Sequence, residues 1–471
     1  MSNAKIKIRN YFDTQLGGDW GQEKPTDVFT EKVLCVRGAD LNSLKLGNTS
    51  SIPYRYINVN NKNTRSLNSR DIVIEISGGS PSQSTGRTAI ITNKILCEVS
   101  IPIVCSNFCR ALRVSENHDP KFVFYMLQNI YNSNIFFNFE GKTTGIKNLD
   151  LNACLDSIPV LDFEIYTQQK IASLLSSLDS KIELNNKINT ELEAMAKAIY
   201  DYWFVQFDFP NAKGKAYKTS GGKMVWNEEL KREIPYGWGV ELMQDWLDIN
   251  KSGDWGKEEP EGNYTTKVSC IRGADINGIN GKGECDPPVR YILEKNVSKI
   301  LNTHDLVIEI SGGSPTQSTG RLTYITEGTQ KRFENPLICS NFCRPASIKN
   351  KKLLYNFVYY WNSLYDAGIF FGYEGKTSGI KNLLLDSFIS SYYTVVPDET
   401  VVNKFYDIME NIQAKKQTAL AENQQLASLR DWLLPMLMNG QVKVGDAEKM
   451  VEEKLSMAAE EKGVYKKSKV K

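Results

Sequence analysis

Polar side chains suited to binding a nucleic acid stand in a glycine-rich loop that this sequence contains twice. The first copy reads Ser-Gly-Gly-Ser-Pro-Ser-Gln-Ser-Thr-Gly-Arg and ends at Arg87, and the second ends at Arg321 with threonine in place of one serine. Arginine can grip guanine through two acceptors, glutamine can pair with adenine, and threonine, lysine and backbone N–H groups hold phosphates. Glycine lets the backbone approach a ligand closely. The loop therefore favours contacts with DNA.

Further residues of these types occur in both copies. The candidate DNA-contacting residues are the pairs Trp20 and Trp255, Arg37 and Arg272, Gln83 and Gln317, Arg87 and Arg321, Lys142 and Lys376, Thr143 and Thr377, and Lys147 and Lys381. The alternative is that the loops are ordinary turns, with Arg87 in a salt bridge and Lys142 in solvent. Repetition of the whole set favours function over turn geometry, although a recent duplication would also produce it.

The repetition covers whole domains. Subtracting positions gives an offset of 234 or 235 for every one of these pairs. A repeat of this length is a duplicated domain rather than a short solenoid unit. Two copies of one surface suggest a target that is itself built twice.

Motifs of common enzymes fail at checkable residues. The run that starts at Gly141, Gly-Lys-Thr, is similar to the end of a P-loop, but Phe136 stands where the first glycine of that motif is required, and the second copy has Phe370 there. The two histidines, His118 and His304, are not equivalent, so no Ser-His or Cys-His pair is repeated. We therefore expect a noncatalytic chain.

The nine cysteines are an odd number in a chain much larger than a disulfide-stapled secreted domain. Zinc prefers four ligands, and the Cys-x-x-x-Cys spacing is poor for a zinc knuckle. We expect buried structural thiols and no metal site. The cysteines repeated in both copies are Cys35, Cys105 and Cys109, with counterparts Cys270, Cys339 and Cys343.

Length and charge set broad limits. The chain has 471 residues, enough for two or three domains, and a formal net charge of +2. This charge is too small to indicate a nucleic-acid partner by itself, because binding depends on local lysine and arginine clusters. No apolar run approaches about eighteen residues, and the first residues lack a secretory signal pattern. The expected location is the cytoplasm.

The candidate loops need strands and helices to hold them. Short β-branched runs at Ile72–Ile76 and Val307–Ile310 are closed by the glycine loops and are typical of strands. Aromatic and apolar stretches over residues 122–137 and 353–371 predict helices. Each globular half is therefore predicted to be α+β.

Long helices are predicted after each half. Glycine and proline are absent from about residue 167 to 204, and roughly 35 helical residues at about 1.5 Å each would make a rod near 50 Å, longer than one domain needs. The seven-residue spacing of apolar residues indicates a coiled coil, in which Leu174, Ile188 and Met195 fill the second side of the seam and Asn185 fixes the register. The alternative is that each stripe packs only on its own domain. The predicted seam residues are Ile171, Leu178, Asn185, Leu192 and Ile199, and then Phe405, Ile412, Ala419, Leu426 and Leu433.

Composition also predicts the domain limits. The Gly- and Lys-rich segment 211–223 is typical of a flexible linker, and Pro435 is expected to end or kink the second helix. The segment after about Asp446 is expected to be a solvated tail. The predicted divisions are domain 1 (1–160), a spacer helix (161–205), a linker (206–233), domain 2 (234–396), a C-terminal spacer helix (397–440) and a charged tail (441–471).

The helical segment also carries a family resemblance. Residues 168–188, Gln-Gln-Lys-Ile-Ala-Ser-Leu-Leu-Ser-Ser-Leu-Asp-Ser-Lys-Ile-Glu-Leu-Asn-Asn-Lys-Ile, and residues 191–204, Glu-Leu-Glu-Ala-Met-Ala-Lys-Ala-Ile-Tyr-Asp-Tyr-Trp-Phe, resemble the central region of the DNA-specificity subunit of type I restriction-modification enzymes. Ile-Pro-Tyr-Gly-Trp at residues 234–238 resembles that family's entry into its second recognition domain.

This resemblance implies two target-recognition domains separated by two long antiparallel helices with pseudo-two-fold symmetry, each domain reading half of a split DNA site. It implies that the helices dock methyltransferase subunits, two of them, and that restriction and translocase subunits complete the enzyme. S-adenosylmethionine, ATP and Mg would belong to those partners, with no cofactor on this chain.

The family usually pairs dissimilar recognition domains, whereas the two copies here share their candidate loops. We therefore predict that both halves read the same short sequence, inverted, as an interrupted palindrome. Two alternatives remain, a nucleic-acid-binding scaffold outside restriction-modification and a self-sufficient nuclease or methylase.

Overall fold

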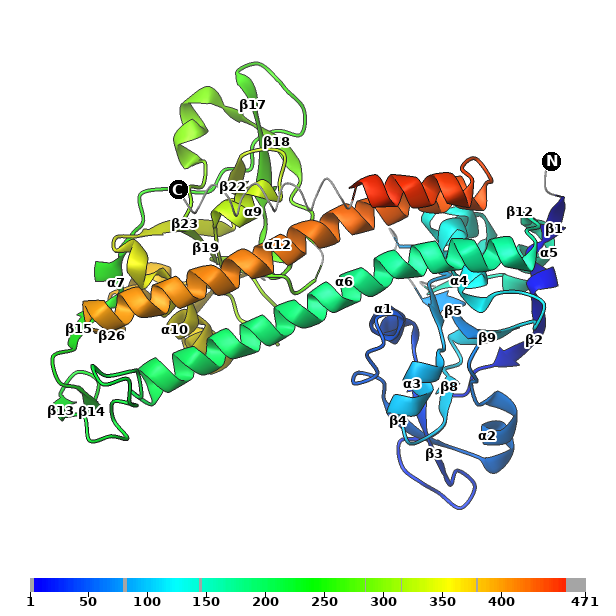
Figure 1. Ribbon diagram of the computed structural model, residues 1–471, viewed down its shortest axis with the longest axis horizontal. Coiled ribbons are helices and arrows are strands. Elements are labelled where there is room, and N and C mark those ends of the chain that lie inside the picture. Colours follow the sequence, from blue (N-terminus) through cyan, green and yellow to red (C-terminus); the bar gives the residue numbers. More distant parts are fainter. Residues whose placement is uncertain are drawn as a thin grey trace. The chain divides into compact units, whose positions relative to one another are not determined.

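A computed structural model describes residues 4–78, 83–143, 146–283, 285–314, 316–377 and 380–454, without the side chains of residues 142–143 and 376–377. The chain divides into two compact units (Figure 1). Unit 1 consists of residues 1–183 and 425–471, and unit 2 of residues 184–424. Both units mix strands and helices, so the predicted α+β class is confirmed.

Unit 1 is built around the strand β5, in which every residue from Asp71 to Glu75 is buried. The β-branched run Ile72-Val-Ile suits a strand that is covered on both faces. The predicted strand is therefore confirmed as the centre of an antiparallel sheet. The sheet order is β2 (Phe12–Gly17), β9 (Cys109–Val114), β5 (Asp71–Glu75) and β7 (Thr88–Ile90).

Smaller sheets and short helices complete unit 1. One sheet has the order β4 (Tyr54–Ile57), β3 (Glu31–Val36), β8 (Ile103–Cys105), and another β10 (Glu140–Thr143), β11 (Ile146–Leu149), β6 (Ser77–Gly78). Strands β1 (Lys5–Lys7) and β12 (Pro159–Leu161) form a pair. The helices are α1 (Leu41–Lys45), α2 (Val59–Arg65), α3 (Asn93–Glu98), α4 (Pro120–Asn132) and α5 (Leu151–Ser157).

Helix α4 starts where its sequence indicates. Asp119 caps it by accepting a hydrogen bond from the backbone N–H of Phe122 at 2.9 Å, and Pro120 takes the first turn. The helix ends at Asn132, and a 3-10 turn (Ile135–Phe139) follows. The predicted helix over 122–137 is thus confirmed in its first part.

Unit 2 repeats this topology. Its sheets have the orders β16 (Leu247–Asp248), β23 (Cys343–Ile348), β19 (Asp305–Glu309), β21 (Leu322–Tyr324); β18 (Val289–Leu293), β17 (Tyr264–Ile271), β22 (Leu337–Cys339); and β20 (Ser311–Gly312), β25 (Ile380–Leu383), β24 (Glu374–Thr377). Further pairs are β13 (Met224–Asn227) with β14 (Arg232–Pro235), and β15 (Gly239–Leu242) with β26 (Tyr393–Val396). The short helices are α7 (Met243–Trp246), α8 (Ile276–Ile279), α9 (Glu327–Lys331), α10 (Leu354–Asp366) and α11 (Leu385–Ile389). The duplication seen in the sequence is therefore a duplication of fold.

The two predicted long helices are present (Figure 1). Helix α6 covers Ile165–Tyr200 and continues into a π-helical turn, Asp201–Val205, and helix α12 covers Glu399–Met438. Leu178 of α6 and Leu426 of α12 are buried in the core of unit 1, together with Ile171 and Leu433. In unit 2, Phe405 and Ile412 of α12 are buried, and Leu192 and Ile199 of α6 pack against the same cluster half-buried.

Within unit 2 the two helices run antiparallel. Asn185 Nδ2 donates a hydrogen bond to Asn423 Oδ1 at 2.9 Å, and eight residues further along α6 Glu193 binds Lys416 Nζ at 2.7 Å, seven residues earlier in α12. The amide pair supports a register role for Asn185, because a shifted pairing would leave that buried amide without a partner.

The prediction that Ile188 and Met195 fill the second side of the seam is wrong. Both side chains are exposed, at 43% and 49%, and Asn189 and Ala196 are buried instead. A seam alternates steps of three and four residues, so apolar side chains at 188 and 195 are not sufficient to choose between the two adjacent stripes. The buried stripe contains the polar Asn189, so it could not be recognised from apolar residues alone.

Three other predictions change. Helix α12 continues through Pro435 to Met438, because a proline so close to a helix end removes little of the hydrogen-bond ladder. Residues 444–454 are helical rather than a solvated tail, and Ala447 and Val451 are buried in unit 1. The segment expected to be a flexible linker has internal bonds, such as the one from Thr219 Oγ1 to Asp208 at 2.6 Å.

Candidate nucleic-acid interface

The structure places Arg87 at the end of the glycine loop, in an ion pair with Glu75 of β5. Arg87 Nε donates to Glu75 Oε2 at 2.8 Å and Nη2 donates to Oε1 at 2.6 Å, with only 17% of the arginine side chain exposed. These hydrogen bonds raise the pKa of the Arg87 guanidinium. The same pair recurs as Arg321 with Glu309, at the same two distances. Direct contact of either arginine with guanine would require this pair to open, so base reading by these residues stays a prediction.

Arg37 lies next to this ion pair. Its Nε and Nη2 donate to the Asp40 carboxylate at 2.9 and 2.8 Å, and 41% of its side chain remains exposed. A Cβ on the following residue, Gly38, would overlap Glu75, so only glycine lets the Arg37 turn approach β5 this closely. Arg272, Asp275 and Gly273 repeat the arrangement in unit 2.

A buried glutamate joins the glycine loop to the hairpin β10–β11. Glu140 Oε1 accepts hydrogen bonds from Thr85 N–H and Oγ1 at 2.6 and 2.9 Å, and Lys147 Nζ lies 3.3 Å from Oε2. Lys147 Nζ also donates to the backbone carbonyl of Gln83 at 3.1 Å, and the Gln83 side chain is exposed. The structure thus brings Gln83 and Lys147 together. In unit 2, Glu374 binds Thr319 and Lys381 in the same way.

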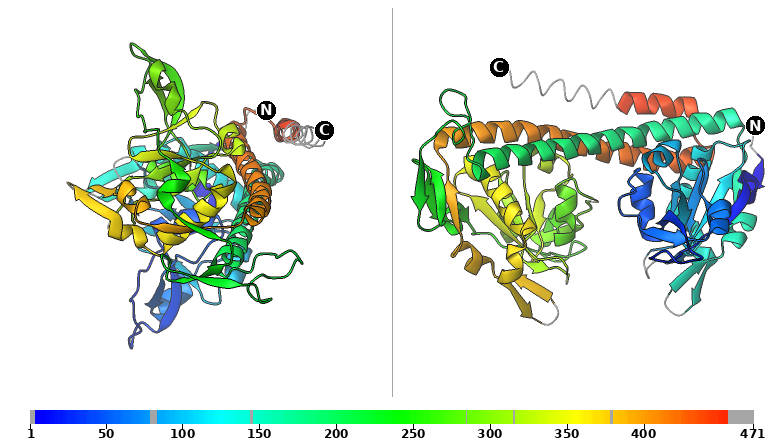
Figure 2. Two further views of the ribbon diagram at one scale, coloured as in Figure 1. Left: turned by 90° about the vertical axis from the view of Figure 1, so that its left-hand side faces the viewer. Right: turned by 90° about the horizontal axis from the view of Figure 1, so that it is seen from below.

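The hairpin carries the remaining lysine and threonine candidates. Lys142 pairs with Lys147 and Thr143 with Ile146 along β10 and β11, and the register is the same in β24 and β25, where Lys376 and Thr377 stand. The side chains of these four candidates, like the glycines at 79 and 145, lie outside the described residues. In each unit taken by itself, the hairpin projects on the side away from the long helices (Figure 2).

The tryptophan candidates stack with arginines. The Arg55 guanidinium lies 4.0 Å from the centre of the Trp20 ring, and Arg55 also pairs with Glu23 at 3.0 Å. Arg290, Trp255 and Glu258 repeat this at 4.0 and 2.9 Å. Trp20 is partly buried and packs against a core cluster, so it contributes to the fold. Its contact with DNA stays a prediction.

The alternative that Arg87 lies in a salt bridge is confirmed, but sequence reasoning did not assign acidic partners to the basic residues of these loops. Asp40, Glu75 and Glu140 recur with the same offset as the basic residues they bind, at Asp275, Glu309 and Glu374. Arg55 recurs as well, at Arg290. The repeat therefore held a signal for ion pairs, which attention to cationic side chains alone passed over.

The repeated cysteines belong to the cores. Cys35, Cys105 and Cys109 are buried free thiols, as are their counterparts in unit 2. Burial raises the pKa of Cys109 to about 12. The prediction of buried structural thiols is confirmed for these six. Over the described ranges, no group of three or more metal-ligating side chains occurs.

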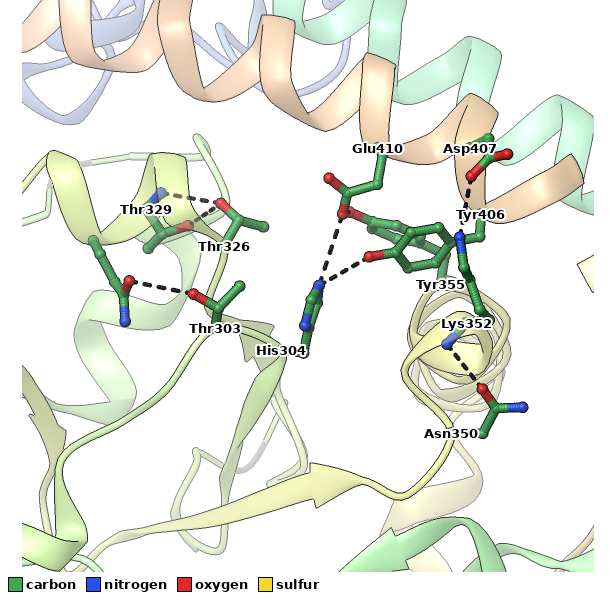
Figure 3. A network of polar contacts seen from close by, with 11 residues as sticks. Thr303, His304, Thr326, Thr329, Asn350, Lys352, Tyr355, Tyr406, Asp407 and Glu410 are labelled. Carbon is green, nitrogen blue, oxygen red and sulfur yellow. Dashed lines mark hydrogen bonds and ion pairs between the residues drawn. The ribbon is translucent and has the colours of Figure 1, made fainter. Parts of the chain in front are cut away.

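Unit 2 holds helix α12 through a polar network (Figure 3). His304 Nε2 lies 2.9 Å from Tyr406 Oη, and Tyr355 Oη donates to Glu410 Oε1 at 2.7 Å. Partial burial lowers the pKa of His304.

No helix in the described part of the chain is both long enough and apolar enough to span a bilayer.

Comparisons with known proteins agree with this architecture. A family described as "Type I restriction modification DNA specificity domain" matches residues 33–194. The MjaIX type I restriction enzyme specificity subunit of Methanocaldococcus jannaschii is 26% identical over 282 residues, which cover 59% of this chain and 59% of that subunit. The HindI specificity subunit of Haemophilus influenzae is 44% identical over 78 residues, covering 16% of this chain and 17% of the relative. The chain thus matches less than two thirds of the length of either relative.

A solved structure shares the fold. The crystal structure of the type I restriction-modification system S subunit from M. genitalium aligns over 93% of this chain and 99% of that one, with a TM-score of 0.51 and 15% sequence identity. At this identity the likeness concerns the fold alone. The chain thus carries a match to the type I restriction modification DNA specificity domain over residues 33–194 and is similar in sequence to specificity subunits of type I restriction enzymes.

Proposed function

We propose that this chain is the noncatalytic DNA-recognition subunit of a type I restriction-modification complex. Each unit reads one half of a bipartite target in double-stranded DNA, and because the two sets of loops are nearly the same, the target is an interrupted palindrome. The observation that carries this proposal is the repetition of complete loop geometry, in which Arg37, Glu75 and Glu140 have the same partners as Arg272, Glu309 and Glu374. Matched surfaces fit matched half-sites.

Acidic side chains fix the C-terminal part of the glycine loop before DNA arrives. Glu75 and Glu140 have buried side chains and bind this part of the loop, at Arg87 and at Thr85. A loop already held in place loses less conformational entropy on binding than a free one. Exposed groups such as Gln83 and the partly exposed Arg37 are then available to bases or phosphates.

The partner subunits would bind the long helices. Leu184, Ile188 and Met195 are 52%, 43% and 49% exposed and follow one side of α6, beside the stripe that packs against α12. An apolar stripe of this spacing fits a helix of another protein. We propose that two methyltransferase subunits dock on the helices, that restriction and translocase subunits join them, and that S-adenosylmethionine, ATP and Mg bind those subunits. The complex would work in the cytoplasm.

The first test is to purify the chain together with the methyltransferase subunit of its own system and to map methylated adenines in a random duplex library. We expect methylation that depends on this chain and falls within an inverted repeat. Two unrelated half-sites would refute the palindrome and keep the recognition role. Methylation that is the same without this chain would refute the recognition role itself.

The docking surface has its own test. Ile188→Asp with Met195→Asp should abolish co-purification of the methyltransferase subunit while the chain keeps its thermal stability, because both side chains are exposed. Lys187→Ala on the same helix, also at an exposed position, is the control. Retained co-purification in the double aspartate variant would place the partner elsewhere.

A further inference from the structure

Two phenylalanines in each unit stand in the solvent next to the candidate interface. Phe108 is 55% exposed and its counterpart Phe342 also 55%, while Phe137 is 53% exposed and its counterpart Phe371 is 47%. Single exposed apolar residues are ordinary on protein surfaces. Four that occupy matched positions in two units need a common explanation.

These phenylalanines are the same in both copies although the helices that precede them have changed, among them the largely buried α4. Only Tyr125 and Tyr131 of α4 have the same residue at the corresponding place in α10, yet the Ile-Phe-Phe that follows each helix is retained. Helix α3 and the corresponding residues 327–332 have no residue in common, yet Cys-Ser-Asn-Phe-Cys-Arg follows in both. Relaxed copies of a duplicated domain would be expected to lose an exposed ring before a buried one, since the ring contributes little packing. The exposed rings therefore have a use outside the folded unit.

The rings flank one short strand pair. The Phe108 carbonyl accepts hydrogen bonds from Ile76 and Ser77 at 2.9 and 3.2 Å, at the start of β6. The Phe137 ring centre lies 5.2 Å from Lys147 Nζ on β11, and Lys147 pairs with Gly78 of β6. In unit 2, Phe371 lies 4.8 Å from Lys381 Nζ, and Phe342 bonds to Ile310 and Ser311. The Phe137 ring and the Phe108 backbone thus border the same ladder that holds the proposed DNA-contacting lysine, and Phe371 and Phe342 repeat this in unit 2.

We propose that Phe137 and Phe108, with their counterparts Phe371 and Phe342, are the apolar contacts to DNA bases in each half-site. This inference rests on the proposed DNA-recognition function. The surroundings of Phe137 are polar, because the ring lies beside Lys147, which itself contacts the Gln83 carbonyl and pairs with Gly78. Such a surrounding suits a base flanked by phosphates better than the apolar core of a protein partner.

The position of Lys147 is fixed independently of Phe137, so the contribution of the ring to DNA binding can be separated from that of the charge. Lys147 Nζ is held by Glu140 and by the Gln83 carbonyl, so its place beside Phe137 does not depend on the ring. Removing the ring therefore removes apolar contact with a base and leaves the local positive charge in place. Loss of a charge contact lowers the salt dependence of DNA binding, whereas loss of an apolar contact lowers affinity at every salt concentration.

The experiment uses the full chain and the duplex that the wild-type chain enriches most strongly from a random library. We expect Phe137→Ala with Phe371→Ala, and separately Phe108→Ala with Phe342→Ala, to bind this duplex about tenfold more weakly, with the wild-type slope of affinity against salt. Phe137→Leu with Phe371→Leu should recover part of the affinity. Trp226→Ala, which removes an aromatic ring that is 57% exposed on β13, is the control and should bind as the wild type does.

The outcomes separate the two proposals. Wild-type affinity in both alanine pairs would overturn the inference and leave DNA recognition intact. Double alanine variants that bind DNA normally but no longer bind the methyltransferase subunit would also overturn the inference, because they would assign the rings to a protein contact. Failure of the wild-type chain to enrich any sequence would overturn the proposed function together with the inference.

Discussion

Arg87 donates two hydrogen bonds to Glu75, at 2.8 and 2.6 Å, across the mouth of the glycine loop. The glutamate is 3% exposed and the arginine 17%. The pair is therefore largely withdrawn from solvent, and each charge depends on the other.

Glu75→Gln should destabilise unit 1 by about 3 kcal/mol, because it leaves the Arg87 charge buried without a carboxylate. Hydrogen exchange of the β5 and β7 amides would measure the loss. Glu75→Leu combined with Arg87→Met removes both charges and should be much closer to the wild type. A Glu75→Gln variant as stable as the wild type would mean that the pair contributes nothing to the fold.

Gly18→Ala should destabilise unit 1 by about 3 kcal/mol, because the added Cβ would overlap the backbone carbonyl of Ser106, which lies in the short turn between β8 and β9 and is held by both strands. Gly17→Ala is a matched control, since nothing lies within 4 Å of a Cβ at that position. Thermal unfolding of both variants would compare them. Equal melting temperatures would contradict the close approach at Gly18.

The stability of unit 2 should fall as the solution becomes acidic. Burial lowers the pKa of His304 in the folded state below the value of about 6.5 for an unfolded chain, so the unfolded state takes up the proton first. The contribution of His304 is complete above about pH 6.5 and is lost as the pH falls towards the folded pKa.

Urea unfolding followed by tryptophan fluorescence can measure this, because six of the eight tryptophans belong to unit 2. His304→Asn is the control, since asparagine accepts the left-handed backbone angle of +76° at this position. The pH dependence between about 7.5 and 5.5 should be weaker in this variant. An unchanged dependence would assign the acid sensitivity to other groups.

Thiol labelling should be selective. Cys97 is exposed. Cys154 lies in the core of unit 1, and this burial raises the pKa of its thiol to about 12. Iodoacetamide at about pH 8 should modify Cys97 first, because the thiolate is the reactive form and the other described thiols are buried, except for the half-buried Cys285, whose pKa is raised by burial to about 11. Peptide mass spectrometry would identify the site, and early labelling of Cys105 or Cys339 would contradict the described cores.

Local patterns in the sequence predicted the strands and the long helices well. The buried run Ile72-Val-Ile and the glycine-free segment before Phe204 each contain the information that their own backbone needs. The second side of the seam was placed one residue off at Ile188 and Met195, because choosing between Ile188 and Asn189 depends on the partner helix. Whether Arg87 faces solvent or Glu75 depends likewise on the tertiary arrangement, twelve residues apart in the chain.

The division of the long helices between the two units has a consequence for synthesis. Unit 2 is one continuous segment, residues 184–424, whereas the core of unit 1 also needs Leu426, Leu433 and Val451 from the far end of the chain. On the ribosome, the second unit can therefore complete its core first. The first unit must wait, with an unfinished apolar face, until residues 426–451 have also been synthesised.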